Sequence, residues 1–449
     1  MYCKTKKYRI NLMQMRYLIL FFAISIMAVG GFFLFSNNYK TFEITPFSSS
    51  TKALATQNKN VKAVNPDADI EPQKPLPNPP KEIKAVYATA WSAGTPNKID
   101  YLIKLIKETE LNAIIIDIKD FSGYIAYDTD LFEIEKYKAE EIKIKKINSL
   151  IKKLHDENIY VIARITIFQD PILAKARPDL AIHSKSKLQE NNIDIGNSAI
   201  KQFSNKTLWL DHKKLAWIDP SAKDAWDYNI AIAKDAANRG FDELNFDYIR
   251  FASDGNLNDM IFPFYDNKTP KNEIIKNFFS YLREKTKGAK ISADLFGLST
   301  INNDDLGIGQ VIEDAYQYFD YVSPMVYPSH YANSFLGYKN PANYPYEVVK
   351  YSMEKAVKRL IDYKLQAMAT STASTSSTIE NWKLEIRNSQ LRPWLQNFDL
   401  GADYDAKMVR KQIQAVYDAA SSTPELINGW MLWDPKNEYT RDALLNPDN

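Results

Sequence analysis

The chain has 449 residues, of which 45% are hydrophobic and 25% are charged, a balance typical of a folded globular protein. Its 57 lysine and arginine residues nearly balance 55 aspartate and glutamate residues, so the net charge of +2 gives no reason to expect nucleic-acid binding. The single cysteine, Cys3, excludes an intrachain disulfide and a cysteine-based zinc site, and the four histidines lack metal-ligand spacing. We therefore expect neither a metal nor another cofactor.

The N-terminus is predicted to be a membrane anchor. Residues 1–16 carry five basic side chains and no acidic one, and residues 17–36 then run uncharged for long enough to span a bilayer. With the basic flank in the cytoplasm, the bulk of the chain is expected on the extracytoplasmic side of the cell membrane. A cleaved signal peptide, which would make the protein secreted, is the alternative. Residues 37–82, rich in Pro, Ser and Asn, are predicted to be a linker, and residues 83–449 the folded domain.

From residue 83 onward, short β-rich apolar segments alternate with segments of helical periodicity. The predicted strands are Ala85–Trp91, Asn112–Lys119, Tyr160–Phe168, Asp242–Phe251, Lys290–Gly297, Tyr321–Pro328, Leu391–Phe398 and Ile427–Asp434. The predicted helices are Lys98–Glu110, Ile147–Asn158, Ala222–Arg239, Asn272–Lys287, Glu347–Tyr363 and Ala406–Ser421. Strands separated by helices imply an α/β fold with parallel strands, and the number eight favours a closed (β/α)8 TIM barrel over an open sheet.

Two polar segments interrupt this alternation, Lys185–Lys206 and Thr370–Asn388. Both are expected to be surface insertions. The first follows the third predicted strand, so it is as compatible with a cap over the mouth of the barrel as with an idle loop.

Polar and aromatic side chains occupy strand positions that a core would not require, most of them near the C-terminal ends, where TIM barrels carry their chemistry. They are Asp117, Lys119, Arg164, Asp247, Tyr248, Arg250, Asp294, Tyr327, Arg392, Trp394, Gln396, Trp433 and Asp434. Singly, each is explained as a cap or a salt-bridging residue. Arg164 needs an anion if it is buried, and Asp117 of the neighbouring strand is its expected partner. Together they predict a site at one rim.

Glycoside hydrolysis fits this set of residues, because it needs two carboxyl groups and no cofactor. Asp247 is the expected nucleophile or base. Asp294 is the candidate acid, with Asp117 and Asp434 as competitors. Arg164 and Arg250 are suited to keep one carboxylate ionised. The candidate sugar platforms are Tyr248, Tyr327, Trp394 and Trp433.

Several strings, in order, resemble a bacterial glycosyl hydrolase domain family, formerly a domain of unknown function, in the TIM-barrel glycoside hydrolase superfamily. They include FDELNFDYIRFASDG, LAWIDPSAKDAWDYN, ISADLFG, YVSPMVYPSHY, RPWLQNFDL and GWMLWDP, within Ala85–Tyr439. The resemblance implies a barrel and a glycan-related role without fixing the substrate. By motif, it also carries over Asp117, Lys119, Trp217, Asp219, Asp247, Asp294, Tyr327, His330, Trp394 and Gln396. The two polar insertions look longer than in the family.

The expected function is therefore hydrolysis of a glycosidic bond in an extracellular or cell-envelope polysaccharide, with the membrane as second partner through the N-terminal helix. A noncatalytic glycan-binding barrel is the alternative. A polysaccharide deacetylase would need a metal, against which the scarce histidines argue.

Overall fold

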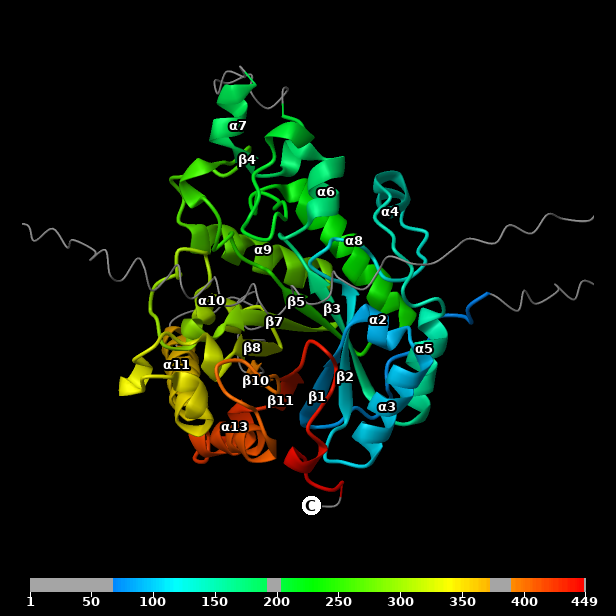
Figure 1. Ribbon diagram of the computed structural model, residues 1–449, viewed down its shortest axis with the longest axis vertical. Coiled ribbons are helices and arrows are strands. Elements are labelled where there is room, and N and C mark those ends of the chain that lie inside the picture. The colour runs from blue at the N-terminus through cyan, green and yellow to red at the C-terminus, as the bar shows by residue number, and fades with distance from the viewer. Residues whose placement is uncertain (1–67, 192–202, 372–388, 448–449) are drawn as a thin grey trace, which may run out of the picture. The chain divides into compact units, whose positions relative to one another are not determined.

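The computed structural model describes residues 68–191, 203–371 and 389–447, and its core is a closed ring of parallel strands (Figure 1). Around the ring these are β1 (Ile83–Ala88), β2 (Ala113–Lys119), β3 (Tyr160–Thr166), β5 (Glu243–Asp247), β7 (Lys290–Phe296), β8 (Tyr321–Met325), β9 (Gln390–Leu391) with β10 (Trp394–Gln396), and β11 (Gly429–Trp433). Pairing of β8 with β10, of β10 with β11 and of β11 with β1 closes the ring. The predicted TIM barrel is confirmed.

Helices cover the outside of this ring in Figure 1. They are α2 (Ala90–Ala93), α3 (Pro96–Lys107), α4 (Phe132–Tyr137), α5 (Ile147–Asp156), α6 (Pro171–Ala176), α7 (Lys185–Glu190), α8 (Lys223–Arg239), α9 (Lys271–Lys285), α10 (Ile312–Tyr316), α11 (Pro345–Ser371) and α13 (Ala406–Ala419). The six predicted helices are among them. The sequence did not reveal the short α2, α4, α6, α7 and α10, because each is too short to show a period of its own.

The core has two layers because successive side chains of a strand point to opposite faces. In β1, Ile83, Ala85 and Tyr87 fill the interior of the barrel, whereas Val86 and Ala88 join the larger cluster between strands and helices. The same alternation in the other strands decides which polar side chains enter the barrel.

Most strands end one to four residues before their predicted bounds, and in two of them a particular residue explains the difference. The strand predicted over Asp242–Phe251 ends at Asp247, because Tyr248 adopts a left-handed conformation with φ of 53° that no strand continues through. The strand predicted over Leu391–Phe398 is split into β9 and β10 at Pro393, which has no N–H to donate to a ladder.

Long segments after β3 and β5 are joined beyond the C-terminal ends of the strands. In β4 (His183–Ser184) and β6 (Met260–Ile261), His183 pairs with Ile261 in an antiparallel sheet. Figure 1 shows β4 with α6 and α7 beyond that end of the barrel. The first predicted insertion thus contains α7, and its remainder between 192 and 202 lies outside the described residues, as does 372–388 of the second.

The compact unit begins at Asp69, whereas the sequence placed the start of the folded domain at residue 83. The Asp69 carboxylate accepts the backbone N–H groups of Asn148 and Ser149 at the start of α5, at 2.6 and 3.0 Å. Leu76 packs against the cluster inside the barrel. The predicted anchor at 17–36 lies outside the described residues, and none of the helices within them is long and apolar enough to cross a membrane.

Candidate active site

Arg164, inside β3, gathers three carboxyl groups from neighbouring strands at the C-terminal side of the barrel. Its Nη1 lies 2.5 Å from Asp117 Oδ1 of β2, and its Nη2 donates to Asp247 Oδ2 of β5. Its Nε lies 3.6 Å from Asp294 Oδ2 of β7. All four side chains are buried. The expected Arg164–Asp117 ion pair is therefore present, and the two acids expected to lie side by side share the same arginine. We call these four residues the Arg164 cluster.

Asp294 is the most enclosed acid of the cluster, with 1% of its surface exposed. Its Oδ1 accepts hydrogen bonds from Asn245 Nδ2 at 2.9 Å and from Trp394 Nε1 at 2.8 Å. Its Oδ2 and Arg164 Nε, by contrast, have no hydrogen-bond partner among the described residues. Burial, reinforced by the negative charge of Asp247, raises the pKa of Asp294 to about 8. Asp294 therefore carries a proton at neutral pH.

Asp247 is in a different position, because two donors hold it. Besides Arg164, the backbone N–H of Tyr248 donates to its Oδ1 at 2.5 Å. The left-handed φ of Tyr248 turns that N–H back toward the carboxylate, a conformation that costs an ordinary residue about 1–3 kcal/mol. Asp247 is therefore arranged as a hydrogen-bond acceptor beside Asp294.

Asp117 forms the other side of the cluster with two aromatic rings. The hydroxyl of Tyr87 donates to its Oδ2 at 2.5 Å. Burial raises the pKa of Asp117, Arg164 opposes the rise, and the nearby charge of Asp120 adds to it. The Tyr87 ring stacks on Trp433 at 3.9 Å between centroids, and the Arg164 guanidinium lies 5.0 Å from the Trp433 ring. Trp433 remains partly exposed, so it links the buried charges to solvent.

Two more predicted residues lie on the β8 side. Tyr327 is buried, and its pKa is raised first by burial and then by the charge of Asp294. His330 meets the Tyr327 ring edge-on at 5.3 Å, and burial lowers its pKa to about 4. Its imidazole is therefore neutral at pH 7, available as a hydrogen-bonding group and not as a cation.

A second group of predicted residues holds the adjoining loop and lies beside the cluster, not in it. The Arg250 guanidinium packs 4.9 Å from the Trp217 ring and 5.1 Å from the Tyr248 ring, and donates to Phe251 O and Ser253 Oγ. The expectation that Arg250 ionises a carboxylate is therefore not supported by a contact, and Arg164 has that position.

Three further predicted residues anchor backbone at the rim. Asp219 accepts the N–H groups of Ser221, Phe264 and Tyr265. Asp434 accepts the N–H of Lys436 at 2.7 Å in a turn, and Gln396 donates to Phe398 O at 2.9 Å. For these residues the contacts match the structural explanation that the sequence also allowed.

Lys119 and Arg392 are directed away from the site. Lys119 Nζ lies 2.8 Å from Asp170 Oδ2, with both side chains fully buried outside the barrel. Arg392 Nη1 contacts both carboxylate oxygens of Glu243, the first residue of β5, at 2.9 and 3.0 Å. That pair belongs to the N-terminal end of the barrel. Neither residue is placed to bind a substrate at the opposite rim.

Sequence reasoning missed Tyr87 and Asn245, both of which hold a carboxyl group of the cluster. The signal was present as a period of two, because Glu243, Asn245 and Asp247 alternate along β5 and so share the inner face. Both residues lie inside strands, whereas the sequence prediction considered mainly residues near the strand ends.

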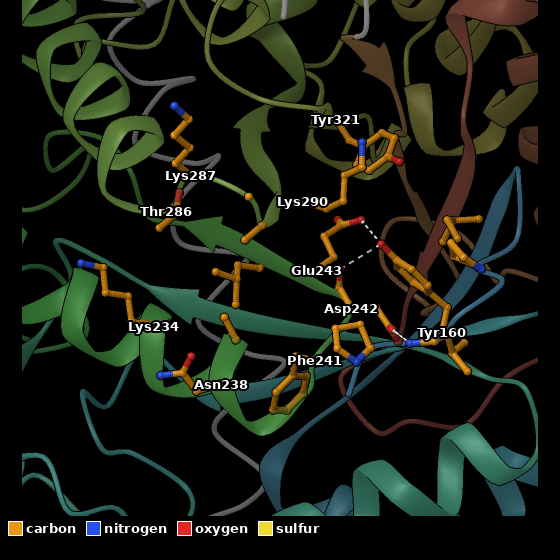
Figure 2. Close-up of a pocket in the computed structure, with 18 of the residues that line it drawn as sticks. Tyr160, Lys234, Asn238, Phe241, Asp242, Glu243, Thr286, Lys287, Lys290 and Tyr321 are labelled. Atoms are coloured by element: carbon orange, nitrogen blue, oxygen red, sulfur yellow. Dashed lines mark hydrogen bonds between the residues drawn. The ribbon is translucent and has the colours of Figure 1, made fainter. Parts of the chain in front are cut away.

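A groove of about 640 Å³ lies at the other end of the barrel (Figure 2). Its lining includes the first residues of five strands, Ile83, Tyr160, Glu243, Lys290 and Tyr321. Figure 2 shows Tyr160 directed toward Asp242 and Glu243, with its hydroxyl 3.3 Å from Glu243 Oε2. Because active sites of such barrels lie at the C-terminal ends of the strands, the volume of this groove does not make it the catalytic site.

No group of three or more His, Cys, Asp and Glu side chains within the described part of the chain is arranged to hold a metal ion. In the Arg164 cluster, the guanidinium occupies the centre that a cation would need.

A closed barrel of eight parallel strands with an acidic cluster at the C-terminal side defines a TIM-barrel protein with an enzyme-like site. The chain belongs to the family described as "Putative glycosyl hydrolase domain", whose model matches residues 85–439. Membership implies a glycosidase-like function. No curated protein matches the chain.

Among solved structures, a hypothetical protein from Ruminiclostridium thermocellum ATCC 27405 is 35% identical, with a TM-score of 0.39, over 46% of this chain and 96% of that one. The PgaB (BpsB) glycoside hydrolase domain from Bordetella bronchiseptica is 14% identical, with a TM-score of 0.47, over 82% and 99%. The α-galactosidase TtGalA from Thermus thermophilus is 11% identical, with a TM-score of 0.43, over 84% and 61%.

Proposed function

We propose that the protein hydrolyses a glycosidic bond in an extracellular or cell-envelope polysaccharide, with Asp294 as the general acid and Asp247 as the nucleophile or base. The observation that carries this proposal is the pair of acids on one arginine with opposite environments. Burial raises the pKa of Asp294 to about 8, while Asp247 accepts hydrogen bonds from Arg164 and from the Tyr248 N–H. Glycosidases require one carboxyl group that gives up a proton and a second that acts as nucleophile or base.

In this scheme Asp294 gives its proton to the oxygen of the leaving sugar as the glycosidic bond breaks. Asp247 either attacks the anomeric carbon or takes a proton from the attacking water, depending on whether the enzyme retains or inverts configuration. Trp433 and Tyr248, both partly exposed beside the cluster, provide apolar faces on which a sugar ring can stack. Arg164 stays charged throughout and compensates the negative charge that develops on Asp294.

The near-complete burial of Asp294 favours one alternative, a barrel that binds glycans without cleaving them. An acid that is 1% exposed needs side chains around it to move before a glycosidic oxygen can reach it. In that case the rings would bind sugar and the carboxyl groups would serve only as hydrogen-bond acceptors.

Incubation of the chain with a panel of bacterial and plant polysaccharides, with reducing ends counted, separates these functions. We expect the wild type to cleave at least one glycan and Asp247→Asn and Asp294→Asn to lose cleavage while still binding it. Asp235→Asn is the matched control, because Asp235 also accepts from a tyrosine hydroxyl and an arginine, Tyr127 and Arg239, but outside the barrel. Binding without cleavage by the wild type would establish the alternative.

We further propose that this domain works outside the cytoplasmic membrane, tethered by residues 17–36. The support is the uncharged span behind a basic flank. Protease added to intact cells is expected to degrade the domain, and full protection in intact cells with digestion after lysis would contradict this location.

A further inference from the structure

Exposed aromatic side chains are distributed unevenly between the two ends of the barrel. Within 68–191, 203–371 and 389–447, all of them lie in segments that leave the C-terminal end of a strand and lead to the next helix of the ring. They are Trp91, Phe121, Phe132, Phe264 and Tyr344. Single exposed rings are common on protein surfaces, but several rings at the end of a barrel that carries an acidic cluster are suited to stack on the flat apolar faces of sugars.

Trp91 is held at the rim by the turn that follows β1. Thr89 caps α2, and its Oγ1 accepts the backbone N–H of Ser92 at 3.1 Å. The cap is itself fixed, because Asn437 Oδ1 accepts the N–H of Thr89. Ala90 and Ala93 of the same turn are buried, whereas the Trp91 ring is 59% exposed. The turn thus presents an indole to solvent on a rigid support.

Charged groups lie close to this ring. Lys143 Nζ lies over the Trp91 ring, 5.5 Å from its centroid, and it contacts Glu141 Oε2 at 3.1 Å and Asp120 Oδ2 at 3.5 Å. The backbone of Lys143 is pressed against α2, since a Cβ on Gly94 would meet its carbonyl oxygen at 1.9 Å. An exposed indole next to an ammonium and a carboxylate suits a sugar ring, whose faces are apolar and whose edge carries hydroxyl groups. We call Trp91, Lys143 and Asp120 the rim patch.

The rim patch adjoins the Arg164 cluster. Asp120 directly follows β2, whose last inward acid is Asp117. The charge of Asp120 acts on both Asp117 and Tyr87, where it adds to the rise in pKa that burial causes first. Trp91 and Asp120 thus follow the two neighbouring strands, β1 and β2, that supply Tyr87 and Asp117, and they lie at the same end of the barrel as the cluster.

We infer that Trp91, bordered by Lys143 and Asp120, is an outer subsite that binds one sugar unit of a glycan chain whose scissile bond lies at the Arg164 cluster. The inference rests on the proposed function and narrows its substrate class, because an outer subsite serves an oligosaccharide or polysaccharide of several units and not a disaccharide.

Calorimetric titration of the full chain carrying Asp294→Asn, in which turnover is expected to stop, tests the subsite. The probes are hexasaccharides of β-1,4-linked glucose, β-1,4-linked N-acetylglucosamine and α-1,4-linked glucose, each beside its disaccharide. We expect one hexasaccharide to bind at least tenfold more tightly than its disaccharide. Adding Trp91→Ala should weaken hexasaccharide binding about tenfold and reduce this ratio, whereas Trp91→Phe should keep most of the affinity. The matched control is Leu445→Ala, which removes an exposed apolar side chain elsewhere.

Hexasaccharide affinity that is unchanged by Trp91→Ala, or that falls equally for the disaccharide, would overturn the subsite and leave the proposed function intact. If cleavage of a glycan is detected but none of the hexasaccharides binds more tightly than its disaccharide, the subsite is also overturned. If no glycan is bound or cleaved at all, the proposed function fails with it.

Discussion

At each end of the barrel an arginine is buried against carboxyl groups, but the buried charges balance at only one end. At the N-terminal end, Arg392 faces the single carboxylate of Glu243, and its other nitrogens donate to the backbone and side-chain oxygens of Asn428. The Tyr321 ring lies 3.8 Å from the guanidinium. Charge is compensated and each guanidinium nitrogen has an acceptor, as expected of an interaction that serves the fold.

At the C-terminal side, Arg164 faces three carboxyl groups, and two polar atoms of the cluster lack hydrogen-bond partners. Excess buried charge of one sign destabilises a protein, so stability does not explain this arrangement. Perturbed pKa values from burial and like-charge neighbours are typical of catalytic sites. Burial of charge alone therefore does not identify an active site, whereas a buried charged group without a compensating partner points to one.

The largest effect is expected from a substitution in the Arg164 cluster, and it is an effect on catalysis. Asp294→Asn should lower the hydrolysis rate by about 10²–10⁴-fold, because the variant has no proton to give to the leaving sugar. Its free energy of unfolding should not fall, since the amide keeps the shape and removes a buried group that resists ionisation. Activity and urea unfolding measured on one preparation check both. Retained activity would remove Asp294 from the mechanism.

The opposite result is expected at the other end. Arg392→Leu should lower the free energy of unfolding by about 3–5 kcal/mol, because it leaves Glu243 buried without its partner. The activity of the molecules that remain folded should stay unchanged, as judged by active-site titration or by activity per folded fraction. A fall in that specific activity would mean that the two ends of the barrel are coupled and that Arg392 serves more than the fold.

A third prediction concerns pH. With a pKa of about 8, Asp294 loses its proton above that pH, so the rate should fall about tenfold per pH unit there. The folded state holds this proton between the ordinary aspartate pKa of 3.8 and about 8, while the unfolded chain does not. Stability should therefore decrease as pH rises through this window, and Asp294→Asn should lack that part of the decrease. Parallel stability curves for the two proteins would contradict the assignment.

The smallest effect is expected at Tyr87→Phe. The change removes the hydroxyl that donates to Asp117 and leaves the stacked ring on Trp433 in place. Losing one donor to a buried carboxyl group should cost about 1–2 kcal/mol of stability. Thermal unfolding checks this value, and a loss several times larger would show that the hydroxyl contributes more than a single hydrogen bond.

The fold was accessible from the sequence because its strands are short apolar runs between helices with clear periods. The ion pair between Asp117 and Arg164 was accessible too, because neighbouring parallel strands place such residues in register. The prediction for Lys119 was wrong because the register of β2 against β3 shifts between Asp117 and Lys119. The two residues would share a face in a regular strand, but here their side chains point to different sides.

Arg392 was misplaced because Pro393 divides its strand. The backbone N–H of Arg392 donates to Val322 near the start of β8, which sets its side chain at the N-terminal end. A sequence does not show on which side of such a break a residue falls. Burial and protonation of Asp294 were likewise inaccessible, since they depend on Asn245 and Trp394 converging from two other strands.

The central claim is that one acid of the Arg164 cluster, Asp294, holds its proton at neutral pH. Carbon-13 NMR titration of aspartate carboxyl carbons in the purified chain tests it without a substrate. We predict one buried carboxyl signal that shifts near pH 8 and is absent from Asp294→Asn. Spectra in which every aspartate has titrated by pH 5 would contradict the claim.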